Sequence, residues 1–439
     1  MLNPLSTARQ RMRAFAGVAI VCIAAWVPPN ALASVPSGEK NALANFAIAT
    51  NVSSWTTNTN WFSATADTCT LYGITCNTTG DHVIGISLSS NNLTGSLPIS
   101  VLTALTALQT LDLTQNKITG LVPTLPSSLT TVSLARNEFT GLLPVLPNSL
   151  TSIDFSNNQL SGGLPSSFPP NLQMLDLGSN ALVGSIPALP NSLKTVVLGV
   201  NKLTGSIPAL PAALNRAEFE DNQLSGPIPA LPAGLQFFTG DDNVGLSGPL
   251  PAFPAALEEF DAQVNQLTGS LPAAFPPNMN RLNLSKNLLI GTIPDLSNAT
   301  QLQSMYVDQN QLTGTLPDLS KTQLQFFVAS QNLLTGTISD LPASIKYLGV
   351  ATNNLTGALP DLPEGMTYIV VGQNHLSGPL PKPPSTLVGS SVLCPNAFEI
   401  PSAYDSEWDA VVTLSPPYKD WWGPAGGGCD NVFENGFNG

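Results

Sequence analysis

The chain has 439 residues and a formal net charge of −13; 10% of its residues are charged and 43% are hydrophobic. So acidic a protein is a poor partner for nucleic acid or for anionic membranes. With 39 prolines and 35 glycines, the composition suits neither a disordered chain nor an ordinary globular domain. A periodic, turn-rich solenoid would account for it.

The first 33 residues have the pattern of a secretory signal peptide. Three arginines, ending at Arg13, precede an apolar run from Ala14 to Val27, and small residues lead to Ala33, after which we expect cleavage. The run is too short for a membrane-spanning helix, and no later stretch is long and apolar enough to cross a bilayer. We therefore expect a secreted protein without a membrane span, extracellular or associated with a cell surface, that keeps 12 basic and 28 acidic residues.

Residues 34–82 are expected to form an N-terminal cap. The stretch GEKNALANFAIA, residues 38–49, predicts a helix. Cys69 and Cys76 lie in this cap, whereas Cys394 and Cys429 lie near the other end of the chain. In an oxidising compartment, pairing within each end is the economical arrangement of these four cysteines.

Residues 83–390 repeat one unit. Asparagines recur at intervals of 21 to 25 residues from Asn91 to Asn374, which defines fourteen copies. A glycine follows each asparagine after four residues, with one slip at Gly248, where Val244 and Gly245 add a residue. The common unit is L-x-x-L-x-L-x-x-N-x-L-T/S-G-x-x-P-x-L-P. Such a period is typical of a solenoid.

Each part of the unit predicts a local structure. The L-x-L segment alternates apolar and polar residues, which predicts a short strand with one buried face. One strand cannot bury that face alone, so successive coils are expected to stack with parallel strands. The asparagine amide is expected to bond backbone groups of adjoining coils. Gly and Pro then turn the chain across the far side, in extended or polyproline conformation and not as a full helix.

Residues 391–439 are expected to form a C-terminal cap and tail. The stretch Leu393-Cys394-Pro395 follows the last coil, and Cys429 can close a cap that contains Trp408, Trp421 and Trp422. Terminal coils need such covers because an apolar cross-section would otherwise face water. The last residues, CDNVFENGFNG, resemble a tail of some secreted bacterial proteins and favour a bacterial source.

The repeat resembles that of leucine-rich-repeat proteins. Its N-x-L-T/S-G-x-x-P stretch is similar to the plant-type extracellular class, found in receptor ectodomains and polygalacturonase-inhibiting proteins. Its L-P-x-L-P-x-x-L stretch is similar to the short bacterial class, and the segment from Trp61 to Cys76 resembles the plant-type N-terminal cap. The resemblance implies an α/β, β-rich solenoid, a right-handed horseshoe with a parallel concave sheet and disulfide-closed caps. It also implies that partners bind on the concave sheet.

The sequence contains no recognisable catalytic or metal-binding constellation. His82 and His375 lie at opposite ends of the array, and no Ser-His-Asp, Cys-His or metal spacing can be assembled from them. We therefore expect no cofactor, no metal and no enzymatic activity. The alternative is a glycosidase that uses Glu218 and Glu220, ~6.6 Å apart along one strand face. Exposed acids on a solvated sheet are the plainer interpretation.

Outward strand positions of copies 7 to 9 collect acidic residues, here called the acidic patch. Its members are Glu218, Glu220, Asp221, Asp241, Asp242, Glu259 and Asp261. Like charges on neighbouring strands repel one another, and a basic protein partner or a cation would relieve that repulsion. A solubilising surface in a generally acidic protein is the alternative interpretation.

Aromatic residues occupy matching outward positions near the end of the array. Phe326, Tyr347 and Tyr368 each lie six residues before an asparagine on three successive strands, and Tyr306 lies nearby on the copy before. Stacked aromatic side chains on an open sheet are typical contacts for proteins or sugar rings. Cross-strand packing that stabilises the sheet is an equal alternative.

Thr or Ser precedes the repeat glycine in twelve of the fourteen copies. Such a hydroxyl row could match an ice lattice, as in some plant-type leucine-rich-repeat proteins, although T/S-G is also part of the ordinary repeat. We expect a monomeric, non-catalytic recognition protein that binds a protein or polysaccharide ligand, in adhesion, host contact or enzyme inhibition. Ice binding is the alternative function.

Overall fold

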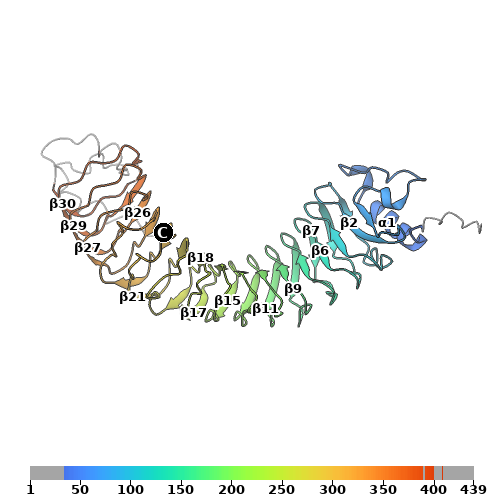
Figure 1. Cartoon of the computed structure of the whole chain (residues 1–439), viewed down its shortest axis with the longest axis horizontal. Coiled ribbons are helices and arrows are strands. Elements are labelled where there is room, and N and C mark those ends of the chain that lie inside the picture. Colours follow the sequence, from blue (N-terminus) through green and yellow to red (C-terminus); the bar gives the residue numbers. More distant parts are fainter. Residues whose placement is uncertain (1–33, 389–390, 400–407, 409–439) are drawn as a thin grey trace, which may run out of the picture.

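The protein is an open arc of stacked coils (Figure 1). The computed structural model describes residues 34–388, 391–399 and 408. The expected signal peptide, residues 1–33, therefore lies outside the described residues, as do most of the expected C-terminal cap and Cys429 with its expected bond to Cys394.

One long sheet of 15 strands lines the inner, concave side of the arc (Figure 1). The first pair of strands is antiparallel, and each later strand lies parallel to the strand of the next copy. This arrangement confirms the predicted solenoid with its parallel concave sheet. The strands are β1 (Ile74–Cys76), β2 (Val83–Ser87), β4 (Thr110–Asp112), β6 (Thr131–Ser133), β8 (Ser152–Asp154), β10 (Met174–Asp176), β12 (Thr195–Val197), β14 (Arg216–Glu218), β16 (Phe237–Thr239), β18 (Glu259–Asp261), β20 (Arg281–Asn283), β22 (Ser304–Tyr306), β24 (Phe326–Val328), β26 (Tyr347–Gly349) and β28 (Tyr368–Val370).

From β4 onward, the middle residue of each strand of this sheet points into the interior of the coil. In β12, Val196 is fully buried, whereas Thr195 and Val197 on either side of it are half-buried. The register places Val196 beside Ala217 of the next strand. Because equivalent positions line up in this way, the interior is one continuous column of apolar side chains, and the outward residues of successive copies form columns on the concave face.

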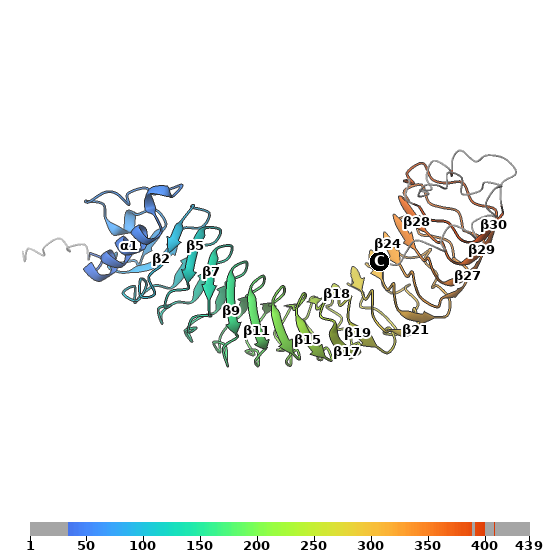
Figure 2. The ribbon, with the colours of Figure 1, turned by 180° about the vertical axis from the view of Figure 1, so that it is seen from behind.

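A second set of strands, which the sequence did not predict, lies on the outer side of the arc (Figure 2). In all of these strands except β30, an extended segment around the repeat glycine pairs in parallel with the equivalent segment of a neighbouring coil. They are β3 (Thr94–Ser96), β5 (Lys117–Leu121), β7 (Glu138–Gly141), β9 (Gln159–Gly163), β11 (Ala181–Ser185), β13 (Lys202–Gly205), β15 (Gln223–Gly226), β17 (Gly245–Pro249) and β19 (Gln266–Thr268) in one sheet, β21 (Ile290–Thr292) and β23 (Gln311–Thr313) in another, and β25 (Thr335–Gly336), β27 (Asn354–Gly357), β29 (His375–Gly378) and β30 (Ala397–Phe398) in a third.

The hydroxyl row before the repeat glycines belongs to these outer strands. The Thr119 hydroxyl donates to the Gly95 carbonyl of the preceding coil at 3.0 Å, and Thr140 donates to Gly120 at 3.3 Å. The same bond recurs at Thr313, Thr335 and Thr356, among other copies. The preference for Thr or Ser therefore has a structural cause within the solenoid, because the hydroxyl ties each coil to the one before it.

The repeat asparagines form a ladder of hydrogen bonds, as predicted. The Asn222 amide donates to the carbonyls of Leu198 at 3.0 Å, Phe219 at 3.2 Å and Glu220 at 3.0 Å. Its Oδ1 accepts from the Leu203 backbone N–H at 2.9 Å. Each asparagine thus satisfies backbone groups of its own coil and of the preceding coil, where the chain turns away from the concave strand.

The ladder has one break, at the slip in copy 8. In regular copies the backbone N–H two residues after an asparagine donates to the next asparagine, as Leu224 does to Asn243 at 3.0 Å. After Asn243 that position is Gly245, whose N–H bonds the Asn243 carbonyl instead. The buried Oδ1 of Asn265 is left without a hydrogen-bond partner among the described residues.

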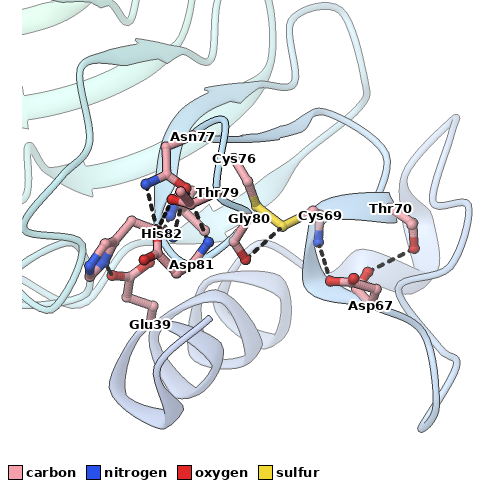
Figure 3. The surroundings of a disulfide bond; sticks show 11 residues. Glu39, Asp67, Cys69, Thr70, Cys76, Asn77, Thr79, Gly80, Asp81 and His82 are labelled. Atoms are coloured by element: carbon pink, nitrogen blue, oxygen red, sulfur yellow. Dashed lines mark hydrogen bonds and ion pairs between the residues drawn. A yellow bond between two sulfur atoms is a disulfide. The ribbon is translucent and has the colours of Figure 1, made fainter. Parts of the chain in front are cut away.

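The N-terminal cap begins with the expected helix. Helix α1 spans Ser37–Ala49, and two 3₁₀ turns follow, η1 (Val52–Ser54) and η2 (Thr68–Thr70). The predicted disulfide between Cys69 and Cys76 is present (Figure 3). Figure 3 also shows Glu39 of α1 facing His82, with Nδ1 of His82 2.6 Å from Oε1 of Glu39. Because Glu39 is buried and also accepts the Val83 backbone N–H, it fastens the cap to the first strand of the array.

Candidate ligand-binding face

The acidic patch lies on the concave side of copies 7 to 9. The register aligns Glu218, Thr239 and Asp261 on neighbouring strands β14, β16 and β18. Asp221 and Asp242 lie in the turns beyond these strands, with left-handed φ values of 49° and 51°. The concave strands and their turns therefore bring the seven acids into one region, with five in or beside the sheet and two at its rim.

Two arginines engage part of the acidic patch. Arg216 forms an ion pair with Glu218 and lies over the Phe237 ring, 5.1 Å from its centroid. Arg281 lies 3.2 Å from Glu259 and 3.3 Å from Asp261, and it also covers the Tyr306 ring at 5.4 Å.

Because of these ion pairs, some acids of the patch are less available to a ligand than their outward strand positions indicate. Asp261 is buried, and Asn283 also donates to its carboxylate at 3.0 Å. Neither arginine was predicted from the sequence, although each occupies an outward strand position, the same column that carries Glu259. That shared column is the signal that could have found them.

Glu220 lies along the sheet and does not project from it. Its carboxylate accepts a hydrogen bond from the Thr239 hydroxyl at 2.7 Å. It also lies over Gly199, where an added Cβ would come within 2.0 Å of Oε1. Only glycine leaves room for the carboxylate at that position. Glu218 and Glu220, the pair considered for glycoside hydrolysis, are thus engaged by different neighbours, Arg216 and Thr239.

Asp241 lies half-buried among other carboxylates of the acidic patch. Burial, and then the charges of Asp261, Glu220 and Asp242, raise the pKa of Asp241 to about 7. Burial and the charge of Asp221 raise the pKa of Asp242, and burial outweighs Arg216 in raising the pKa of Glu218. No ion pair engages Asp241 within the described part of the chain.

The patch extends further than the sequence analysis placed it. Asp176 of β10 lies beside Val197, which in turn lies beside Glu218. Burial, then Asp154 and both glutamates of copy 7, raise the pKa of Asp176 to about 6. Asp154 and Asp176 occupy the same outward column as Glu218, so the repeat alignment itself was the signal that could have included them.

The aromatic residues meet on the concave face of the last copies. Phe326 pairs in register with Tyr347, and Tyr347 with Tyr368. The two tyrosine rings lie 6.0 Å apart, inclined by 39°. Tyr306 stands in the adjacent column, opposite Val328. Phe326 is 37% exposed, so this aromatic column is accessible to a ligand.

Within residues 34–388, 391–399 and 408, no group of three or more metal-ligating side chains lies together. None of the helices in the described residues is long and apolar enough to span a bilayer.

Comparisons with known proteins identify the repeat. A family model described as Leucine Rich Repeat matches residues 107–129 and 149–170. The structure of a plant peptide hormone receptor, RGFR1 in complex with RGF2, is 27% identical with a TM-score of 0.62, over 71% of this chain and 55% of that one. The Arabidopsis receptor kinase HAESA ectodomain, solved with a peptide hormone ligand, is 24% identical with a TM-score of 0.53, over 83% and 70% of the two chains.

A plant ice-binding protein is 25% identical with a TM-score of 0.49, over 71% of this chain and 91% of that one. No curated protein matches the sequence. This chain thus spans about half the length of the RGFR1 structure. The protein is a leucine-rich-repeat protein whose fold is similar to that of plant receptor ectodomains.

Proposed function

We propose that the protein is a secreted, non-catalytic recognition protein that binds a basic peptide, or a basic segment of a protein, on its concave face. The signal-peptide pattern and the Cys69–Cys76 disulfide support an extracellular location. The similarity to RGFR1, a peptide hormone receptor, supports a peptide as the class of ligand.

The observation that carries the proposal is the gathering of Glu220, Asp241 and Asp242 on the concave side, with no ion pair to any of them among the described residues. A pKa of about 7 for a carboxyl group means that its ionised form is disfavoured by burial and by its neighbours. A cationic side chain placed beside Asp241 would favour the ionised form and so gain binding free energy that a neutral ligand cannot gain.

The length of the patch limits the ligand segment. From β10 to β18 the sheet has four strand spacings, each ~4.8 Å, which amounts to about 19 Å across the strands. An extended peptide rises ~3.3 Å per residue, so about six residues cover that distance. We therefore expect recognition of a short basic segment.

A displayed library of ten-residue peptides tests this function. The wild-type protein should enrich peptides rich in Lys and Arg, and enrichment should weaken as salt is added. A variant with Glu220→Gln, Asp241→Asn and Asp242→Asn should lose the enrichment. The matched control carries Asp340→Asn and Asp361→Asn, which remove exposed acids outside the concave strands. Equal enrichment by the patch variant and the wild type, or no basic enrichment at all, would exclude the proposed function.

The pH dependence provides a second test. Because the pKa of Asp241 is raised, its carboxylate ionises as pH rises through about 7. Affinity for a basic peptide from the library should therefore increase between pH 5.5 and 8.5, and Asp241→Asn should flatten this dependence. A wild-type affinity independent of pH in that range would contradict the role of Asp241.

A further inference from the structure

A polar pocket opens beside the aromatic residues of the last copies. It has a volume of about 330 Å³ and is lined by Thr300, Gln301, Gln303, Gln323, Gln325 and Ser344. Its lining comes from the segments that lead into β22, β24 and β26, and all six residues are uncharged. A volume of this size is within the range of small-ligand sites, roughly 300–1,000 Å³.

The pocket offers amide groups for hydrogen bonding. The Gln325 amide donates to Oε1 of Gln303 at 3.2 Å, which fixes the two side chains relative to each other. Among the described residues, no other side-chain bond engages the amide nitrogen of Gln303 or the amide oxygen of Gln325. The amide nitrogen of Gln303 and the amide oxygen of Gln325, one donor and one acceptor, are therefore held side by side where β22 and β24 begin.

The aromatic column begins next to this pocket. Phe326 directly follows Gln325 in the chain, and Tyr347 and Tyr368 continue the column on the next two strands. The Tyr347 ring lies towards Gly349, where an added Cβ would come within 2.8 Å of its Cε1. The missing side chain at position 349 thus lets the ring lie along the sheet.

Charge distinguishes this surface from the acidic patch. The outward positions of β24, β26 and β28 are Phe326, Val328, Tyr347, Gly349, Tyr368 and Val370, none of them charged. Asp308 accepts a hydrogen bond from Ser285 at 2.5 Å and, after burial, contributes to raising the pKa of Tyr347. Lys346 directly precedes Tyr347 and follows Gln325 in the column before the strands. A charged ligand would therefore lose hydration here and meet single charges, not a matching row of countercharges.

We propose that this surface, the aromatic–amide site (Gln303, Gln325, Phe326, Tyr347 and Tyr368), binds a neutral polysaccharide. The apolar faces of its sugar rings stack on the aromatic column, and its hydroxyl groups bond the two glutamine amides and Asp308. A wholly apolar ligand fits less well, because it would leave the pocket amides without partners. The aromatic–amide site and the acidic patch lie on different strands and share no residue.

Affinity electrophoresis and calorimetry on the purified full chain test the site. Hydroxyethylcellulose and neutral xylan in the gel should retard the protein, and cellohexaose or xylohexaose should bind in calorimetry. Polygalacturonate is the charged comparison and should not retard it. Loss of one stacking ring should weaken binding by up to about tenfold. We expect this loss for Tyr347→Ala and near-wild-type binding for Tyr347→Phe, which keeps the ring.

Further variants separate the site from its neighbours. Gln303→Ala changes an exposed pocket residue and should also weaken binding, whereas Tyr72→Ala removes an exposed ring of the N-terminal cap and should not. The triple acidic-patch variant should lose basic peptides but keep the oligosaccharide, so the two proposals can fail separately. Absence of binding to every neutral glycan, equal binding by Tyr347→Ala and wild type, or a Tyr347→Ala defect confined to peptides would overturn the proposal.

Discussion

Deletion of Val244 should stabilise the protein, because it removes the slip in copy 8. The deletion makes the repeat glycine the fourth residue after Asn243, which is the spacing of the other copies. The Leu246 backbone N–H would then occupy the ladder position and donate to Oδ1 of Asn265, which is now buried without a partner.

The size of the effect follows from the ladder. In regular copies the equivalent oxygen accepts a bond of 2.9 to 3.0 Å, as at Asn222 and Asn243. A buried polar atom without a partner costs about 1–3 kcal/mol. Val244 also has a φ of 22°, and such a conformation costs a non-glycine residue about 1–3 kcal/mol. The deletion loses an exposed bond from Gln266 to the Val244 carbonyl, about 1 kcal/mol, so we expect a net gain of about 1–5 kcal/mol.

Hydrogen exchange of copies 8 and 9 is the direct assay, since each coil touches only its neighbours. Amides of β16 to β20 should exchange more slowly in the deletion variant, and urea unfolding should shift to higher concentration. The matched control inserts valine after Asn222, which should orphan Oδ1 of Asn243 and destabilise copies 7 and 8 by a similar amount. Faster exchange or a lower urea midpoint in the deletion variant would refute the reasoning.

Three further predictions concern the cap and the turns. The hydrogen bond to Glu39 raises the pKa of His82. Its contribution to cap stability is therefore present below the ordinary histidine pKa of about 6.5 and is lost as pH rises through the raised value. The free energies of unfolding of wild type and His82→Gln in urea should converge above that pH, and a difference that stays constant with pH would contradict this. Replacing both Cys69 and Cys76 by Ala should cost about 2–3 kcal/mol and speed exchange in α1 while leaving β16 unchanged, and simultaneous loss at both would contradict local unfolding. Val200 has a φ of 56°, so Val200→Asn should raise stability by about 1 kcal/mol in urea unfolding, whereas Val145→Asn, at an exposed position outside the left-handed turns, should not.

The fold could be predicted well from the sequence, because each residue that recurs in the repeat unit has its own physical cause. Asn222 illustrates this, since only a side chain with both a donor and an acceptor can make its four bonds. The outer strands escaped prediction because their residues, such as Thr119 and Gly120, read as turn residues. These segments pair because stacking places equivalent segments of successive coils side by side, which is a property of the whole array and not of the local sequence.

The candidate site was less predictable than the fold. Columns of outward residues follow from the repeat alignment, which is why Tyr347 and Tyr368 do lie side by side. The repeat alignment does not predict in which direction each side chain of a column points or which neighbour it contacts. Arg281 reaches both Glu259 and Asp261, and Glu220 bends over Gly199, whereas Asp241 has no ion pair among the described residues.

The asparagine ladder also bears on how the length of such a chain can change. A whole added or lost copy brings its own asparagine and its own N–H donor, so every bond still finds a partner, whereas one added residue at Val244 leaves Asn265 without its donor. Recombination between similar stretches of the gene can therefore duplicate or delete complete copies at little conformational cost. Copies inserted between β18 and β24 would move the acidic patch away from the aromatic–amide site without redesign of any coil.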